Sequence, residues 1–249
     1  MRALFLKLLI VTAATIVSSY ALAGEIRVAV ASNFSNAMVA IADQFETETG
    51  HTVKLSFGST GKHYAQIVNG APFDAFFAAD VKRPELLEKE GLGMAGSRFT
   101  YAVGKLILWS PEPDLVDPHA DILKQGTFRH LAIANPKLAP YGVAARQVLQ
   151  SLELWQDMQG RLVRGENIGQ AFQFVASGNA ELGFVARSQL KYPGQEATGS
   201  AWEVPQSLYD PIEQQAVLLN DKQAARAFMS FVHSDSAIRI IRAHGYEIP

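Results

Sequence analysis

Four short turns of this chain carry small polar residues, each where an apolar strand is expected to end and an amphipathic helix to begin. The turns are residues 31–34 (ASNF), 58–61 (GSTG), 140–142 (PYG) and 166–169 (ENIG). The first N–H groups of a helix have no partner inside the helix, and they lie at the positive end of its dipole. Several such ends that converge on one point can bind a small oxyanion without lysine or arginine. The spacing therefore predicts a site for a small anion.

The polar residues of these turns have a second interpretation as ordinary helix caps. Ser32, Asn33 and Thr60 are all of types that are common at the N-cap position. A capping side chain accepts a hydrogen bond from the main chain, whereas an anion-binding side chain donates one to the ligand. No single turn distinguishes the two roles, and the recurrence of four such turns favours the anion site. Arg161 and Arg164, just before the fourth turn, could contact a dianion, although solvation at the surface is the more common fate of such arginines.

Other chemistries have weaker support. Residues 58–62 (GSTGK) resemble the end of a nucleotide-binding P-loop, but that motif requires glycine at position 56 and serine or threonine at position 63, where the chain has Ser56 and His63. The chain lacks cysteine, and its six histidines are too scattered to pair as metal ligands. It also lacks the G-x-S-x-G motif of a serine hydrolase. We expect no nucleotide site, no resident metal ion and no enzymatic activity.

Strands and helices are expected to alternate along the chain. Apolar runs predict strands at 26–31, 53–57, 73–78, 101–109, 130–134, 162–163, 182–186 and 213–219, helical stripes fall between most of them, and residues 111–118 and 191–200 are expected to be loops. This order is typical of an α/β fold with mostly parallel sheets flanked by helices, which bind ligands at the carboxyl ends of their strands.

The strand–helix pattern restarts after about residue 104, which predicts two lobes of similar design. Lobe 1 would comprise residues 24–102 and 215–249, and lobe 2 residues 103–214. The runs at 101–109 and 213–219 would be two strands that cross between the lobes. A ligand would then bind between them.

The N-terminus predicts export. Arg2 and Lys7 give a positive start, residues 8–17 are mostly apolar, and Ala21-Leu22-Ala23 has the form of a cleavage site, so we expect a signal peptide over residues 1–23, cleaved after Ala23. Without a cysteine for lipid attachment, a Gram-negative periplasm is the expected location. The whole chain has 22 basic and 24 acidic side chains, a balance that does not favour a nucleic-acid partner.

Most of the mature chain resembles the periplasmic molybdate-binding proteins of ABC importers. The matching segments are residues 28–38, 57–80, 134–142, 165–185 and 242–249. The resemblance implies the two-lobed fold of type II periplasmic binding proteins, hinged by two crossing strands. It also implies a monomeric receptor that delivers molybdate or tungstate to a membrane permease, with molybdenum present only as the bound oxyanion and no cofactor.

The resemblance further implies which residues hold the anion. They are Ser32 and Asn33 at the first turn, Ser59 and Thr60 at the second, Tyr141 at the third, and the main-chain N–H of Ile168 at the fourth. Two positions depart from the family pattern. Ala186 stands where some members have a tyrosine that donates to the anion, and Thr60 stands where many have serine.

The chemistry of the ligand agrees with a site made only of donors. A tetrahedral dianion such as molybdate carries no proton near neutral pH, so all its oxygens accept hydrogen bonds, whereas partly protonated phosphate also needs an acceptor. Two alternatives stay open. One is a receptor for another small anion, such as sulfate or an organic acid, and the other is an exported hydrolase, for which the sequence offers no nucleophile–base pair.

Overall fold

The structure is a computed structural model that describes residues 23–196 and 198–249. The predicted signal peptide over residues 1–23 lies outside this part, apart from Ala23. Among the described residues, no helix is both long and apolar enough to span a bilayer.

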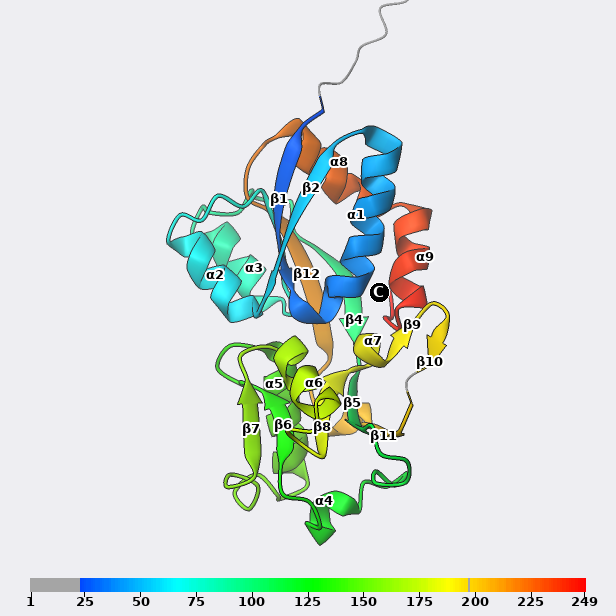
Figure 1. Cartoon of the computed structure of the whole chain (residues 1–249). Helices are drawn as coiled ribbons and strands as arrows, with labels where there is room; N and C mark the ends of the chain where they lie inside the picture. The colour runs from blue at the N-terminus through cyan, green and yellow to red at the C-terminus, as the bar shows by residue number, and fades with distance from the viewer. Residues whose placement is uncertain (1–22, 197) are drawn as a thin grey trace, which may run out of the picture.

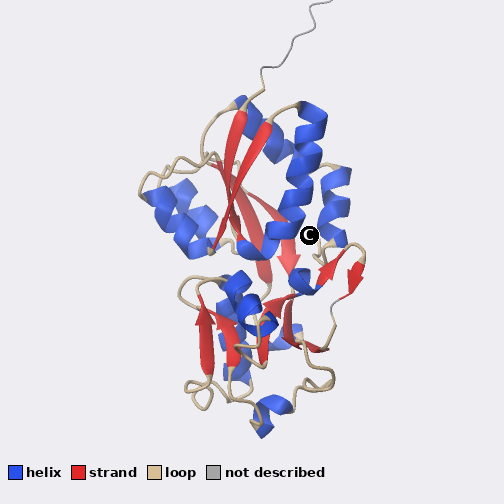
Figure 2. Cartoon of the chain, in the orientation of Figure 1, coloured by secondary structure: helices blue, strands red, loops and turns tan. Residues whose placement is uncertain are grey.

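Two five-stranded sheets, each between helices, follow one another along the long axis of the molecule (Figures 1 and 2). In the first sheet the strand order is β2 (Thr52–Gly58), β1 (Glu25–Ala31), β3 (Ala75–Phe77), β12 (Ile212–Leu218) and β4 (Phe99–Gly104). Strand β1 is parallel to β2 and β3, while β12 is antiparallel to both its neighbours. We call this sheet with its helices the first lobe.

Helices cover both faces of the first sheet (Figure 1). They are α1 (Ser35–Thr49), α8 (Gln223–Val232) and α9 (Asp235–Ala243) on one face, and α2 (Thr60–Val68) and α3 (Lys82–Lys89) on the other. The alternation of side chains along β1 explains both cores: Val28 and Val30 pack with α1 and α8, whereas Ala29 packs with Ile67 and Leu87 of α2 and α3.

The second sheet has the order β11 (Ser200–Glu203), β5 (Leu106–Ser110), β8 (Leu182–Ala186), β6 (Leu131–Ala134) and β7 (Leu162–Gly165). Helix α5 (Pro140–Ser151) packs on one face through residues such as Ala145 and Val148, and α6 (Ile168–Ala176) packs on the other through Val175. Two short helices, α4 (Ile122–Gln125) and α7 (Arg187–Leu190), complete what we call the second lobe.

The chain crosses between the sheets twice. The predicted strand at 101–109 is two strands, because the pairing of β4 ends where Gly104 meets Ile212, the first residue of β12, and β5 then begins at Leu106 opposite Ala186. The return passes through the 3-10 turn Gln206–Leu208 into β12, which lies entirely in the first sheet. The predicted lobe boundaries, 102/103 and 214/215, fall inside β4 and β12.

Further differences from the predicted elements lie in residues 191–203. The predicted loop at 191–200 contains the short hairpin of β9 (Lys191–Tyr192) and β10 (Gln195–Glu196), and β11 begins at its end. Strand β11 pairs with β5 from Ser200 opposite Ser110 to Glu203 opposite Ile107. It therefore adds an antiparallel edge to the second sheet.

Candidate functional site

A small cavity lies between the lobes, at the carboxyl ends of β1, β2 and β3. Its volume is about 10 Å³. Its lining is Ala31, Ser32, Asn33, Gly58, Ser59, Thr60, Ala79, Ala139, Pro140, Tyr141, Asn167 and Ile168. All six residues predicted for the anion site are in this set, and they come from both lobes. The four turns of the sequence analysis therefore meet at one point.

The start of α2 leaves one main-chain donor for this cavity. The Gly61 N–H, second in the helix, donates to the Leu138 carbonyl at 2.8 Å, across the gap between the lobes. The Lys62 N–H, third in the helix, donates to the hydroxyl of the N-cap Ser59 at 3.3 Å. The Thr60 N–H, the first of the helix, takes part in neither of these bonds and is left for the cavity.

The starts of α5 and α6 repeat this pattern. In α6, the Gly169 N–H donates to Ser32 Oγ at 3.3 Å and the Gln170 N–H to the N-cap Asn167 side chain at 3.0 Å, which leaves the Ile168 N–H. In α5, the first residue is Pro140, which has no N–H, and the N–H of the third residue, Gly142, donates to the Ala139 carbonyl at 3.0 Å. The Tyr141 N–H is left over. Three helices thus each offer one N–H group from a predicted site residue.

Four hydroxyl groups of the lining already accept a hydrogen bond from the protein. Ser32 accepts from the Gly169 N–H at 3.3 Å, Ser59 from the Lys62 N–H at 3.3 Å, Thr60 from the Ala79 N–H at 3.1 Å, and Tyr141 from Gln214 Nε2 at 3.3 Å. An oxygen that accepts such a bond keeps its own hydrogen for donation. Of these four groups only Ser59 caps its own helix, so the cap interpretation of Ser32, Asn33 and Thr60 is wrong: the N-cap positions beside them are Ala31, Phe34 and Ser59. Each of the four hydroxyl groups keeps a hydrogen that it could donate to a ligand.

Asn33 differs from the other predicted residues. Its side-chain amide donates to Gln214 Oε1 at 2.8 Å and to the Tyr246 hydroxyl at 3.0 Å, so both amide hydrogens are used within the protein. The main-chain carbonyl of Asn33 accepts from the hydroxyls of Tyr246 and Ser188 at 2.6 and 2.9 Å. The side chain of Asn33 thus holds the turn in place, and the group it can offer to a ligand is its main-chain N–H.

The electrostatics of the cavity favour an anion without a formal positive charge. All twelve lining residues are uncharged, and the three helix starts contribute the positive ends of their dipoles. Burial raises the pKa of Tyr141 well above its usual value, so its phenol stays protonated and able to donate. Among the described residues, no cluster of three or more histidine or carboxylate side chains could hold a metal ion.

The two arginines that precede the fourth turn contact other groups. Arg161 donates to the Phe128 carbonyl at 2.6 Å, and Arg164 donates to the Gln159 side chain at 2.6 Å. Neither belongs to the cavity lining. Ala186 is fully buried at the end of β8 and offers no side-chain donor, in agreement with the departure noted in the sequence.

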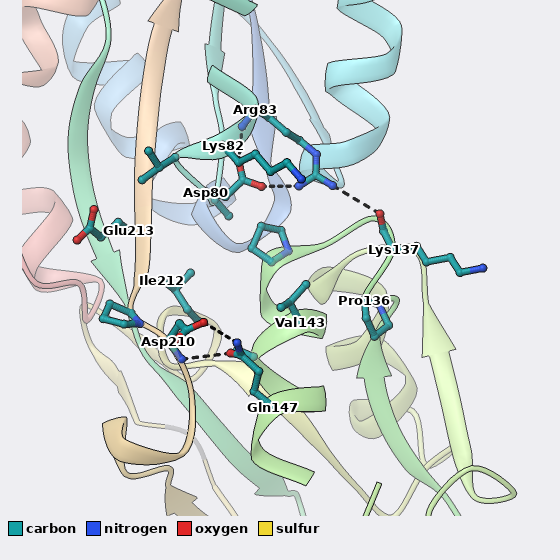
Figure 3. A pocket seen from close by; sticks show the side chains of 15 residues that line it. Asp80, Lys82, Arg83, Pro136, Lys137, Val143, Gln147, Asp210, Ile212 and Glu213 are labelled. Carbon is teal, nitrogen blue, oxygen red and sulfur yellow. Dashed lines mark hydrogen bonds and ion pairs between the residues drawn. The ribbon is translucent and has the colours of Figure 1, made fainter. Parts of the chain in front are cut away.

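A second, larger groove of about 610 Å³ is shown in Figure 3. It lies beside the cavity, because Ala79 and Pro140 line both. Its charged lining residues are Asp80, Lys82, Arg83, Lys137, Asp210 and Glu213. Arg83 forms an ion pair with Asp80 and donates to the Lys137 carbonyl at 3.5 Å (Figure 3). Because the lining of this groove includes carboxylates, the small uncharged cavity suits a dianion better.

Direct contacts hold the lobes together around the cavity. Lys62 Nζ lies 2.6 Å from Glu166 Oε2 in a half-exposed ion pair, in addition to the main-chain bond between Gly61 and Leu138. Of the residues that support the site, Asn167 lies in a predicted turn and Tyr246 lies in the matching segment 242–249, whereas Gln214 lies outside every turn and segment singled out in the sequence. Because the Lys62–Glu166 ion pair and the Gly61–Leu138 bond join the two lobes, the structure describes the site with the lobes closed on it.

Comparisons with known proteins agree on one family. The bacterial extracellular solute-binding protein family matches residues 26–247. The molybdate-binding protein ModA of Azotobacter vinelandii is 53% identical over 243 residues, 96% of each chain, and that of Rhodobacter capsulatus is 48% identical over 229 residues, 91% of this chain and 89% of the other. The solved periplasmic molybdate-binding protein of Azotobacter vinelandii superposes with a TM-score of 0.87 at 46% identity, over 90% of this chain and 99% of that one.

Proposed function

Since the chain belongs to the bacterial extracellular solute-binding protein family, we propose that it is a receptor for molybdate and tungstate. The observation that carries this proposal is the uncharged cavity between the lobes, in which the lining hydroxyl groups and the N–H groups of Thr60, Tyr141 and Ile168 are available as donors. The names of the two relatives at 53% and 48% identity, both molybdate-binding proteins, give it independent support.

The anion would be held by both lobes at once. Ser32, Asn33, Ser59 and Thr60 would donate from the first lobe, and Tyr141 and Ile168 from the second, with Asn33 and Ile168 acting through their main-chain N–H groups. A hydrogen bond to a charged group contributes about 1.5–3 kcal/mol. Five to eight such bonds, after the costs of desolvation and closure, support binding in about the micromolar range or tighter.

Binding of this kind favours the closed form, because the ligand makes its full set of contacts only when the lobes meet. The closed form would deliver the oxyanion to the membrane permease of an ABC importer. The receptor would act as a monomer in the periplasm, after cleavage of its signal peptide behind Ala23. The division into residues 24–102 with 215–249, and 103–214, stays a proposal, and its boundaries fall within β4 and β12 of the first sheet.

Thermal melting of the chain from Gly24 onward, with and without molybdate, tungstate, sulfate and phosphate, tests the proposal. A ligand that binds only the folded state raises the melting temperature by mass action. We expect a rise with molybdate and tungstate and none with sulfate or phosphate. A rise with sulfate or phosphate alone would overturn the specificity and keep the anion site. No rise with any of the four would overturn the proposed function.

A further inference from the structure

Gln214 is fully buried on β12, the strand by which the chain returns from the second lobe to the first. A buried amide is costly unless its polar atoms are paired. Its oxygen accepts from Asn33 Nδ2 at 2.8 Å and from the Tyr101 hydroxyl at 3.0 Å, and its Nε2 donates to the Tyr141 hydroxyl at 3.3 Å. One side chain thus contacts a site residue of each lobe.

The surrounding backbone is shaped for this arrangement. Between β12 and β4, Gln214 pairs with Ala102 and Gln215 with Thr100, so Tyr101 is the extra residue of a β-bulge. Bulges of this kind redirect a side chain. At Gly104, a Cβ atom would lie 2.7 Å from Gln214 Nε2 and still closer to the Tyr141 hydroxyl, so a glycine is required for the two groups to meet there.

We propose that Gln214 is a positioning residue for the oxyanion site, which fixes the Asn33 turn of the first lobe and the Tyr141 phenol of the second relative to each other. Because Nε2 donates to the Tyr141 oxygen, the phenolic hydrogen is directed away from Gln214 and is available to the cavity. Because Oε1 holds the Asn33 amide, the first turn keeps its main-chain N–H groups at the cavity. This inference rests on the proposed oxyanion binding.

The adjacent residue supplies a matched control. Gln215 is also a glutamine of β12, but its side chain contacts Arg98 at 2.6 Å and Thr100 at 3.0 Å, and neither lines the cavity. Gln214→Met and Gln215→Met each remove one amide from the same strand and keep a side chain of similar length. A purely structural effect on β12 would appear in both variants.

Calorimetric titration with molybdate, on wild type and both variants, tests the inference. We expect Gln214→Met to weaken binding at least tenfold and Gln215→Met to leave it within about threefold. A wild type that does not bind molybdate would overturn the proposed function, whereas a wild type that binds and a Gln214→Met variant within threefold of it would overturn the role of Gln214 alone. Circular dichroism establishes that each variant is folded.

A double-mutant cycle with Tyr141→Phe separates positioning from a general loss of stability. If Gln214 acts partly through the Tyr141 hydroxyl, the affinity losses of Gln214→Met and Tyr141→Phe will be less than additive. Strictly additive losses would contradict that route. Should Gln214→Met fail to fold, Tyr101→Phe removes one of the bonds to Oε1 and keeps the ring. We then expect a severalfold weaker affinity, and unchanged affinity would overturn the proposal.

Discussion

At the scale of single residues, each of the four hydroxyl groups of the cavity accepts a hydrogen bond from the protein and keeps its own hydrogen. Thr60 is buried, and its oxygen accepts from the Ala79 N–H at 3.1 Å, which links the start of α2 to the end of β3. That bond orients the hydroxyl and directs its hydrogen elsewhere. The same group therefore stabilises the turn and keeps a hydrogen that it can donate to the proposed ligand.

Removing the Thr60 hydroxyl at nearly constant volume should weaken molybdate binding. We expect Thr60→Val to lower the affinity by about tenfold to a hundredfold, because one charge-assisted hydrogen bond is lost. Calorimetric titration measures this change. Thr60→Ser, which keeps the hydroxyl, should bind within a few fold of wild type. A Thr60→Val variant with wild-type affinity would remove Thr60 from the site.

At the scale of elements, helix α2 also forms part of the closure between the lobes. The N–H of Gly61 donates to the Leu138 carbonyl of the second lobe, so the helix start touches the other lobe through its backbone. A Cβ atom at position 61 would lie 2.9 Å from the Leu138 carbonyl oxygen and 3.1 Å from its Cα. Both are main-chain atoms, which cannot move away as a flexible side chain would.

Gly61→Ala should therefore separate folding from closure. Alanine favours the helix by about 0.5–1 kcal/mol over glycine, so the ligand-free variant should melt at or slightly above the wild-type temperature. Its affinity for molybdate should fall by about tenfold, because the closed form is strained. Gly160→Ala, at a position open to solvent, provides the control and should bind as wild type. Equal affinities for both variants would contradict this role of the glycine.

Local patterns predicted most elements, whereas long-range pairing decided the rest. The apolar stripe over residues 168–176 predicts helix α6, whereas the structure is what identifies Asn167 as its N-cap. Strand β11 was missed because its partner β5 lies about 90 residues earlier, and α7 has only four residues, too few to show a helical period. Likewise, the turns of the site could be predicted, but the contact of Gln214 with Asn33 joins residues 181 positions apart.

At the scale of the whole molecule, one carboxylate in each lobe supports the end of its sheet that is remote from the cavity. Asp74 precedes β3, where it accepts from the Arg27 N–H at 2.8 Å and pairs with Lys222 at 2.8 Å. Glu181 precedes β8, where it accepts from Arg129 at 2.9 Å and from the His130 N–H at 2.9 Å. The cavity lies at the opposite, carboxyl ends of these strands.

Both carboxylates make the stability of the molecule depend on pH. Burial alone would raise the pKa of Asp74, but hydrogen bonds from Lys222, the Arg27 N–H and Asn220 outweigh it and lower that pKa. Burial likewise opposes the shift at Glu181, where the bonds from Arg129 and His130 lower the pKa to about 2. A carboxyl with a lowered pKa stabilises the fold at pH values above its unfolded pKa, and this contribution is lost as the pH falls towards the folded one.

The pKa of Glu181 is 4.5 in the unfolded chain and about 2 in the folded one, so we expect the free energy of unfolding to decrease as the pH falls between these values. In Glu181→Gln this decrease should be shallower. At neutral pH the variant should lose about 1 kcal/mol of stability, since its ion pair is partly exposed. Urea unfolding at a series of pH values measures both effects.

The control for the loss of a negative charge is Glu213→Gln, because Glu213 is an exposed glutamate on β12. This variant should keep the wild-type dependence of stability on pH. Because Glu181 lies far from the cavity, its variant should bind molybdate at neutral pH as wild type does, and a weaker affinity would mean that this end of the sheet is coupled to the site.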